Sequence, residues 1–276
     1  MKNNLNKTGV LVDIGGTTVK FGSISSNRDK PLCVFSTPSD SESLLKLIID
    51  NVNSIFEETN IDRKVIISCP GLVTRNGVVK KALYVPLSGV DIKREISLCT
   101  KSDVFVENDA NVQALGMYEE CDLLYMCIGT AIGGAYISSG QVLAGNDGFS
   151  CEFGHVGGFG DEKCFCGMLG CLDTVASGRA LELAFGEIWW TANTEKVNDI
   201  LTQVGGDVGK ALSRLNVLFN PGQLVLAGRL CQYTSFTTSV YLAFNNSSWD
   251  RGSLSFIDDT WYSSIKGGER VLYSMT

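Results

Sequence analysis

The chain has 276 residues, of which 44% are hydrophobic and 19% are charged, and its formal net charge is −7. This length is sufficient for one large domain or for two smaller lobes, each with its own core. An acidic chain without a basic run binds nucleic acid and anionic membrane surfaces poorly, because both need clustered Lys and Arg. A role on nucleic acid or at a membrane is therefore not expected.

The N-terminal sequence and the cysteines indicate the compartment. Residues 1–8 are polar and lack the apolar core of a signal peptide, and no apolar run approaches the length of a membrane span. A cytoplasmic location is therefore expected. In a reducing compartment the ten cysteines should be free thiols or metal ligands rather than a disulfide framework.

The first part of the chain predicts strands joined by glycine turns and amphipathic helices. Strands are expected at 10–12, 19–25, 65–68 and 104–106, and helices at 40–59 and 110–118. The first two strands are joined by a turn with paired glycines at 13–18.

The second part repeats this opening more than a hundred residues later. Strands are expected at 123–128, 135–138 and 224–227, and helices at 177–190 and 195–219, the latter interrupted at Gly205–Gly206. From Tyr233 onward the periodicity is weak and predicts no element. The repeated strand–turn–strand unit predicts a duplicated architecture, with an N-terminal lobe over 1–118 and a C-terminal lobe over 119–276.

The two glycine turns, Asp13–Thr18 (the first elbow) and Gly129–Gly134 (the second elbow), are candidate phosphate sites. Glycine lets backbone N–H groups face a phosphate without a Cβ in the way. A lone turn of this kind is more typical of a plain hairpin, whereas two of them favour a nucleotide clamped between lobes. The candidates for ATP and Mg²⁺ are Asp13, Gly15, Gly16, Thr17, Thr18, Lys20, Gly129, Thr130 and Ala131, with Asp13 holding Mg²⁺ through water.

Asp109 follows the strand at 104–106 and opens a helix, within the run Glu-Asn-Asp-Ala-Asn at 107–111. A carboxylate at a strand end can accept the proton of a bound hydroxyl as a phosphoryl group is transferred. The segment by itself is more typical of a helix cap.

The cysteines between 164 and 171 form the strongest pattern. Cys164, Cys166 and Cys171 fall within eight residues, and His155, the single histidine of the chain, lies nine positions upstream. Three thiolates and one imidazole are a common closed tetrahedral zinc set. The alternative is a group of loop thiols beside an unrelated histidine.

These motifs together resemble a known family. Asp-Ile-Gly-Gly-Thr-x-x-Lys at 13–20 resembles the first phosphate motif of the sugar kinase, hexokinase and actin superfamily. Within it, the region from about Val10 to Gly228 is similar to the ROK group of bacterial sugar kinases and repressors. The resemblance implies an α/β, two-lobed actin-like ATPase fold, with duplicated ribonuclease H-like lobes and a central nucleotide and sugar cleft.

The resemblance also implies residue roles. The segment at 107–111 is similar to the ROK catalytic segment, which makes Asp109 the base and Asn108 a sugar ligand. The segment at 151–173 is similar to the ROK signature, which gives His155 a zinc-facing and a sugar-facing ring nitrogen. Glu152 and Asp173 are then sugar ligands, and Gly228 belongs to the adenosine loop.

The chain departs from the family pattern at four places. The usual Glu is Asp173, the usual Gly before the first Glu is Cys151, and the middle glycine of the second elbow is Ala131. A usual Gly-Gly pair is Ala227–Gly228. The family commonly closes with a helix packed on the first lobe, but residues 254–276 show little helical periodicity.

Three functions follow as hypotheses. The first is an enzyme that transfers the γ-phosphoryl of ATP, with Mg²⁺ and a structural Zn²⁺, to a hexose or N-acetylhexosamine, at carbon six of glucose or N-acetylmannosamine. The second is a sugar-responsive repressor, disfavoured because the nine residues before Val10 cannot hold a DNA-binding module. The third is a catalytically weak sugar-binding protein. A homodimer is expected from the family.

Overall fold

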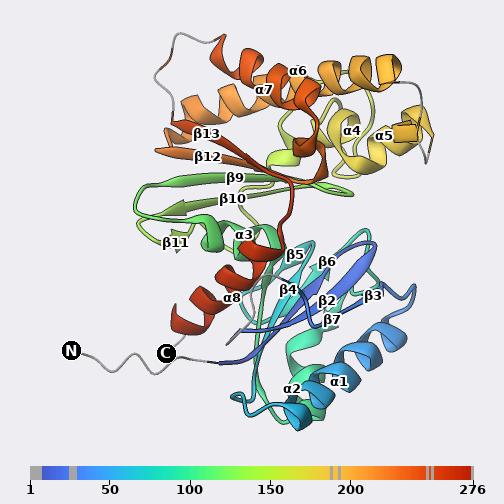
Figure 1. The fold of residues 1–276 in the computed structure, drawn as a ribbon, viewed down its shortest axis with the longest axis vertical. Coiled ribbons are helices and arrows are strands. Elements are labelled where there is room, and N and C mark those ends of the chain that lie inside the picture. Colours follow the sequence, from blue (N-terminus) through green and yellow to red (C-terminus); the bar gives the residue numbers. More distant parts are fainter. Residues whose placement is uncertain are drawn as a thin grey trace. The chain divides into compact units, whose positions relative to one another are not determined.

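The computed structural model describes residues 8–24, 30–186, 189–191, 194–246, 249 and 252–274. The chain folds into two compact units (Figure 1). The first unit comprises Met1–Met117, Ala144–Ser150 and Trp261–Thr276, and the second comprises Tyr118–Leu143 and Cys151–Thr260. Residues 144–150 and the C-terminal helix thus belong to the first unit. The sequence instead predicts one boundary after residue 118, with all later residues in the second lobe.

The first unit is built on a five-stranded sheet in the order β3-β2-β1-β4-β8. Its strands are β1 (Val10–Ile14), β2 (Thr18–Ser23), β3 (Cys33–Ser36), β4 (Lys64–Cys69) and β8 (Asp103–Asn108). β1 to β3 are antiparallel neighbours, whereas β1, β4 and β8 run parallel. The last residue predicted for the second strand, Ser25, lies outside the described residues. A small second sheet contains β5 (Leu72–Val73), β6 (Val78–Lys81) and β7 (Val90–Asp91).

Alternating apolar residues give this sheet two buried faces, because successive side chains of a strand point to opposite sides. Val10, Val12 and Ile14 belong to one core cluster, with the buried faces of α1 (Ser41–Glu58) and α2 (Ile92–Thr100). Leu11 belongs to another cluster, on the side of α3 (Asp109–Met117) and α8 (Trp261–Ser274).

The C-terminal helix α8 lies where the sequence predicts no element. It packs against α3 at small residues: a Cβ on Gly267 would overlap the carbonyl oxygen of Val112, and one on Gly116 would overlap the backbone of Ser263. The two backbones therefore approach too closely for any larger residue, and α8 covers the Leu11 face of the sheet. Gly267, which weakens the helical pattern of this segment, is thus required by the packing.

The second unit repeats the first sheet. Its order is β11-β10-β9-β12-β13, formed by β9 (Leu123–Ile128), β10 (Ile132–Ser138), β11 (Gln141–Val142), β12 (Gln223–Ala227) and β13 (Ser253–Ile257). Here too the first three strands are antiparallel neighbours and the remaining two run parallel to the first of them. Counted along the chain, both sheets have the order 3-2-1-4-5, which confirms the predicted duplication.

The helices of the second unit are α4 (Asp173–Ala176), α5 (Gly178–Phe185), α6 (Thr194–Phe219) and α7 (Thr234–Asn245), with 3₁₀ turns η1 (Phe153–His155), η2 (Trp189–Thr191) and η3 (Arg229–Gln232). The predicted helix at 177–190 is wrong in extent. Ser177 caps it as expected, but the helix ends at Phe185, before Gly186 with a φ of 91°. Residues 187–188 lie outside the described residues.

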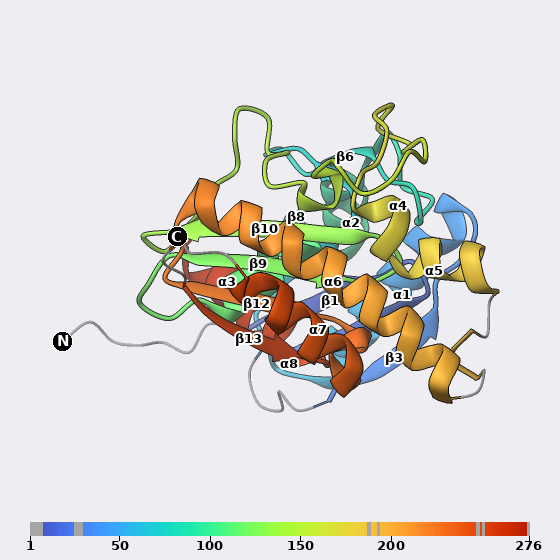
Figure 2. The same cartoon turned by 90° about the horizontal axis from the view of Figure 1, so that it is seen from above.

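The predicted interruption at Gly205–Gly206 is also wrong, because α6 runs through both glycines. A Cβ on Gly205 would lie 2.6 Å from the carbonyl oxygen of Phe236 in α7, and one on Gly209 would overlap that of Val240. The glycines let α6 and α7 pack backbone to backbone, and Figure 2 shows the two helices side by side over β12 and β13.

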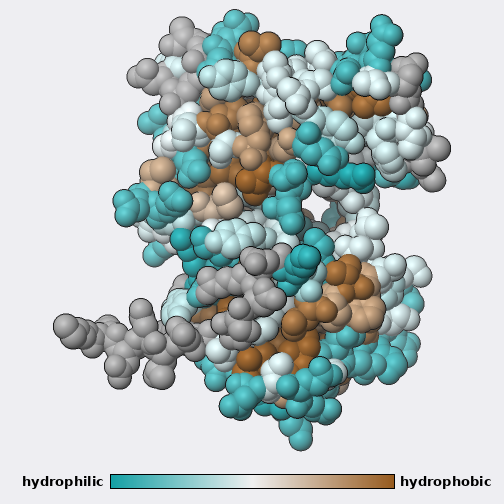
Figure 3. All heavy atoms as spheres, in the orientation of Figure 1, coloured by the Kyte–Doolittle hydropathy of each residue, from teal (hydrophilic) through white to brown (hydrophobic). Residues whose placement is uncertain are grey.

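The surface keeps some apolar side chains among the hydrophilic ones (Figure 3). The most exposed large ones are Leu218 at 76%, Leu183 at 71% and Leu98 at 66%. Among the described helices, none combines the length and apolar character needed to cross a membrane.

We expect Gly267→Ala to lower the free energy of unfolding by about 2–3 kcal/mol, because the added methyl group forces α3 and α8 apart. Urea unfolding measures the change. Gly268→Ala is the matched control on the same helix: its Cβ would meet only the side-chain ends of Leu11 and Ile24, at 3.3 and 3.4 Å. Equal effects of the two substitutions would contradict the close packing of α3 on α8.

Candidate functional site

The first elbow is a tight turn after the central strand of the first sheet. The Gly15 N–H donates to the Thr18 carbonyl at 2.8 Å, and the hydroxyl of Thr37 donates to the Gly15 carbonyl at 2.7 Å. The Thr37 N–H also donates to the Thr17 carbonyl at 3.0 Å. Gly16 and Thr17 are exposed at the tip. Thr37 fixes the turn, and no signal in the sequence singles it out.

Asp13 lies directly behind this elbow and is 8% exposed. Its two carboxylate oxygens accept hydrogen bonds from the hydroxyls of Ser68, at 2.7 Å, and Ser264, at 3.5 Å. Burial raises the pKa of Asp13, while the Ser68 bond and the charge of Lys20, its partner across β1 and β2, act in the opposite direction. Ser68 and Ser264 come from β4 and α8, so only the tertiary structure identifies them.

Parallel strands place further polar groups at the same edge. Asp13, Ser68 and Glu107 are neighbours in register across β1, β4 and β8, and each strand ends one residue later. Ligand sites of open α/β sheets lie at the carboxyl ends of their strands. The first elbow and the β8–α3 junction therefore share one edge of the first unit.

The β8–α3 junction has a defined hydrogen-bond network. The Oδ1 atom of Asn108 accepts from the Asn111 N–H at 3.2 Å, and its Nδ2 donates to the Gly71 carbonyl at 3.1 Å. The Glu107 carboxylate accepts from the Asn108 N–H at 2.8 Å and from Asn111 Nδ2 at 2.9 Å. An N-cap side chain accepts a hydrogen bond from the N–H of the third residue of its helix. In α3 that residue is Asn111, and the side chain that accepts its bond is Asn108.

Asp109 is half-buried, and its carboxylate accepts from the Ala110 N–H at 2.9 Å. It lies near Cys69 at the end of β4: burial raises the pKa of the Cys69 thiol, and the charge of Asp109 adds to the rise. The helix-capping alternative is thus weakened, because Asn108 already makes that bond.

The second elbow follows the central strand of the second sheet. Its Gly129 N–H donates to the Ala131 carbonyl at 3.0 Å. The first N–H groups of α5 hold it from outside, with Gly178 donating to Gly129 at 2.8 Å and Arg179 to Thr130 at 3.1 Å. Ala131 is not among the described residues with positive φ, so the backbone here does not require the family's glycine.

Gly228 directly follows β12, beside this elbow. Its φ is +120°, and a Cβ there would overlap the carbonyl oxygen of Ile128, the last residue of β9. No other residue type fits both the backbone conformation and the close approach. The carboxyl ends of β9 and β12 thus bring Gly228 and the second elbow together.

Cys151 adopts a conformation that favours glycine. Its φ is +66°, in the left-handed region where a Cβ crowds the backbone. This explains why the resembled signature has glycine at this position. A turn in this conformation leads into Glu152 and η1.

His155, Cys164, Cys166 and Cys171 converge as predicted. Their ligand atoms all lie within 4.8 Å of one another. His155 Nδ1 is 3.5 Å from Cys164 Sγ, and Cys166 Sγ is 3.6 Å from Cys171 Sγ. Zinc bonds of about 2.3 Å to sulfur and 2.0–2.1 Å to nitrogen in a tetrahedron imply ligand separations of about 3.6–3.8 Å. The two pairs at 3.5 and 3.6 Å agree with these separations, and the four residues could hold a metal ion.

Backbone bonds and ring contacts hold the loop that carries these ligands. The Cys164 N–H donates to the Met168 carbonyl and the Gly167 N–H donates back to Cys164, at 2.8 and 2.9 Å. Phe165 packs edge-on against the His155 ring at 4.9 Å between centroids. Arg214 of α6 donates to the Gly157 carbonyl at 2.8 Å. The loop is thus shaped around the ligand set by its own hydrogen bonds.

Glu152, His155 and Asp173 form an electrostatically coupled group. Burial raises the pKa of Glu152 and of Asp173, and the charge of Asp173 adds to the rise at Glu152. Burial lowers the pKa of His155, against the influence of Asp173. Asp173 Oδ1 accepts from the Ile132 N–H, at the end of the second elbow, at 2.8 Å.

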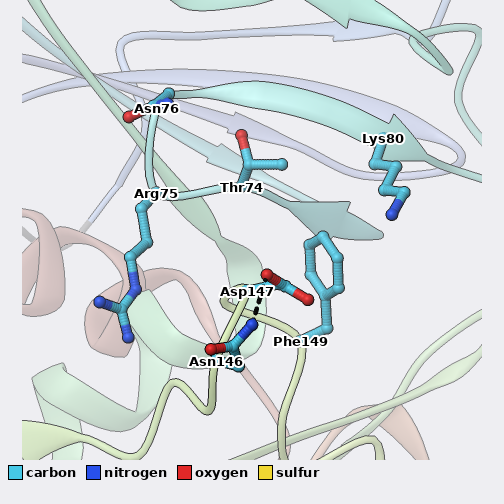
Figure 4. Close-up of a pocket in the computed structure, with 7 residues that line it drawn as sticks. All are labelled: Thr74, Arg75, Asn76, Lys80, Asn146, Asp147 and Phe149. Carbon is cyan, nitrogen blue, oxygen red and sulfur yellow. Dashed lines mark hydrogen bonds between the residues drawn. The ribbon is translucent and has the colours of Figure 1, made fainter.

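A separate hollow of about 270 Å³ lies in the first unit (Figure 4). Thr74, Arg75, Asn76 and Lys80 of the β5–β6 hairpin face Asn146, Asp147 and Phe149. Lys80 Nζ lies 5.5 Å from the Phe149 ring centroid, and Arg75 donates to the Gly145 carbonyl at 2.7 Å. None of the predicted site residues lines it.

Comparison with known proteins agrees with this architecture. The duplicated sheet with its two elbows defines an actin-like α/β fold of the sugar kinase type. The model of the ROK family matches residues 10–250, and the chain belongs to this family.

Three similar proteins illustrate the match. An N-acetyl-D-glucosamine kinase of Pectobacterium carotovorum subsp. carotovorum (strain PC1) is 25% identical over 253 residues, covering 80% of this chain and 83% of that protein. The ROK hexokinase of Thermus thermophilus aligns with a TM-score of 0.79 and 25% identity over 97% of this chain and 99% of that one. A ROK family glucokinase from Streptomyces griseus, in complex with glucose and AMPPNP, aligns with a TM-score of 0.79 at 21% identity, covering 98% and 100%.

We expect Cys151→Gly to be more stable than Cys151→Ala by about 0.5–1 kcal/mol. Glycine has no Cβ and so removes the strain of the left-handed conformation. Its larger conformational entropy in the unfolded state cancels part of this gain. Both variants delete the thiol, so the comparison isolates the Cβ. Urea unfolding measures the difference. A glycine variant less stable than the alanine variant would show that the conformation at 151 is not strained.

Proposed function

We propose that this chain is an ATP-dependent sugar kinase that phosphorylates a hexose or an N-acetylhexosamine. The observation that carries the proposal is the ROK family match over residues 10–250, with named sugar kinases among the relatives. The N-acetylglucosamine kinase and the glucose-bound neighbour favour an acceptor of this class. We place the reacting hydroxyl on carbon six, of glucose or an N-acetylated hexosamine such as N-acetylmannosamine.

Asp109 is the proposed general base. A sugar hydroxyl is a poor nucleophile until its proton is accepted, and a carboxylate beside it accepts the proton as the bond to phosphorus forms. Support comes from the position of Asp109 at the carboxyl edge of the first sheet, and from Asn108 making the helix-capping bond in its place.

Asn108, Glu152, His155 and Asp173 are the proposed sugar ligands. His155 suits this role, because its Nδ1 lies 3.5 Å from Cys164 Sγ, which leaves Nε2 for a sugar hydroxyl. The partly buried carboxylate of Glu152 can accept hydrogen bonds from sugar hydroxyls.

The two elbows are the proposed phosphate sites. Their backbone N–H groups and the hydroxyls of Thr17, Thr18 and Thr130 are donors that a triphosphate needs, and Lys20 adds a positive charge. Gly228 leaves room for the adenosine. Both oxygens of Asp13 already accept from serine hydroxyls, so this side chain suits contact with Mg²⁺ through water. When bound, Mg²⁺ neutralises charge that develops on the transferred phosphoryl group.

His155, Cys164, Cys166 and Cys171 are the proposed zinc ligands. The convergence of three thiols and one imidazole, with two pairs at tetrahedral separations of 3.5 and 3.6 Å, supports the proposal. The ion would be structural: it fixes the orientation of the His155 ring and the fold of the loop.

Asp109→Asn should lower kcat for sugar phosphorylation by about 10²–10⁴, because the amide cannot accept the proton. A coupled assay of ADP release with a panel of hexoses and N-acetylhexosamines measures it. ADP affinity should stay unchanged.

Asp91→Asn is the matched control, since Asp91 also opens a helix and accepts from the Arg94 N–H at 3.0 Å. It should keep full activity. Wild-type turnover with none of the sugars would contradict the kinase proposal, and full activity of Asp109→Asn would contradict the assigned base.

Purified protein should contain about one zinc per chain by elemental analysis. Cys166→Ser should reduce the metal content and lower Tm, because the loop loses a ligand. Cys99→Ser is the control, as Cys99 is an exposed free thiol elsewhere. Metal-free wild-type protein with an unchanged Tm after chelation would exclude the structural zinc.

A further inference from the structure

Asp173 makes a contact that a sugar ligand does not need. It is 7% exposed, begins α4 and follows the thiol of Cys171 by two residues. Its Oδ1 atom accepts from the Ile132 N–H at 2.8 Å, across 41 positions of sequence. Ile132 is the first residue of β10, so the carboxylate holds the second elbow at the point where the chain enters that strand.

The rest of the elbow is held by the same stretch of chain. Ser177 links α4 to α5, donating to the Asp173 carbonyl at 2.7 Å and accepting from the Ala180 N–H at 3.1 Å. The next two N–H groups, of Gly178 and Arg179, bond the carbonyls of the elbow's first two residues. Residues 171–179 therefore hold the elbow by hydrogen bonds at Gly129, Thr130 and Ile132.

The turn that carries Glu152 and His155 packs on this contact. A Cβ on Gly154 would lie 2.8 Å from the Ile132 carbonyl oxygen and 3.5 Å from the Asp173 Cβ. The side chain at 173 is thus enclosed between the elbow and η1. The aspartate side chain is one methylene shorter than the glutamate of the resembled signature, and at this length it reaches the Ile132 N–H.

We propose that Asp173 is a positioning residue for the phosphoryl donor, fixing the second elbow in the shape that receives the nucleotide phosphates. This role deepens the proposed kinase function and rests on it. A preorganised set of donors binds phosphate more tightly, because no ordering cost is paid on binding. The carboxylate acts through the elbow and does not itself contact the phosphates.

Calorimetric titration with ADP in the absence of sugar tests the proposal on the zinc-loaded protein. Asp173→Leu keeps the side-chain size and removes the acceptor, and it should weaken ADP binding about tenfold, as expected for losing one hydrogen bond to a charged group. Asp173→Asn keeps an oxygen acceptor and should stay within about threefold of wild type. Asp173→Ala replaces the leucine variant if that one does not fold.

Asp122 provides the matched control. It accepts from the Ser139 N–H at 3.0 Å, at the opposite end of the same β9–β10 hairpin. Asp122→Leu should leave ADP affinity unchanged. Amide hydrogen exchange should quicken at Ile132 only in the variants at 173 that lack an acceptor.

The outcomes separate the two proposals. An ADP affinity that is equal in Asp173→Leu and wild type overturns the positioning role and leaves the kinase proposal standing. Equal losses in Asp173→Leu and Asp122→Leu also overturn it, since they would reflect general destabilisation. Absence of ADP binding by the wild type overturns both.

Discussion

The site depends on one topological constraint: in each unit the central strand is paired to an antiparallel hairpin on one side and to parallel strands on the other. β1 and β9 occupy this central place. The chain must turn sharply where each of them ends, and the parallel neighbours end at the same edge. The first elbow thereby lies at the edge that carries the β8–α3 junction, and the second elbow lies beside Gly228. The same arrangement, used twice, supplies two glycine turns at corresponding places.

Close backbone packing holds the helices around this framework. α8 lies against α3 at Gly267 and Gly116, and α7 lies against α6 at Gly205 and Gly209. The packing of α8 on α3 also places a candidate site residue, because the hydroxyl of Ser264 in α8 donates to Asp13 behind the first elbow. The C-terminal helix thus contributes to the support of the first elbow, although it is the last element that the structure describes.

In the second unit a short stretch of chain connects the candidate metal ligands to the second elbow. Cys171 is one of the four converging ligand groups, and within eight residues the chain supplies Asp173, Gly178 and Arg179 to the second elbow. The proposed metal ion would therefore be linked through this stretch to the proposed phosphate turn. Such a link would suit a phosphoryl-transfer enzyme, in which the position of the donor controls the rate.

The sequence by itself determined the features that depend on local pattern. The strands around both elbows, the amphipathic α1 and the spacing of Cys164, Cys166 and Cys171 all follow from residues close together in the chain, and the family likeness followed from these motifs. The tertiary structure decided what depends on distant partners. Glycines at 205 and 267 suggest a break or an irregular end when read locally, but they allow helices to meet at backbone distance. Likewise, only folding brings Ser68, Ser264 and Thr37 to the first elbow and Asp173 to the second, because single hydrogen bonds across tens or hundreds of residues leave no periodic trace in a sequence.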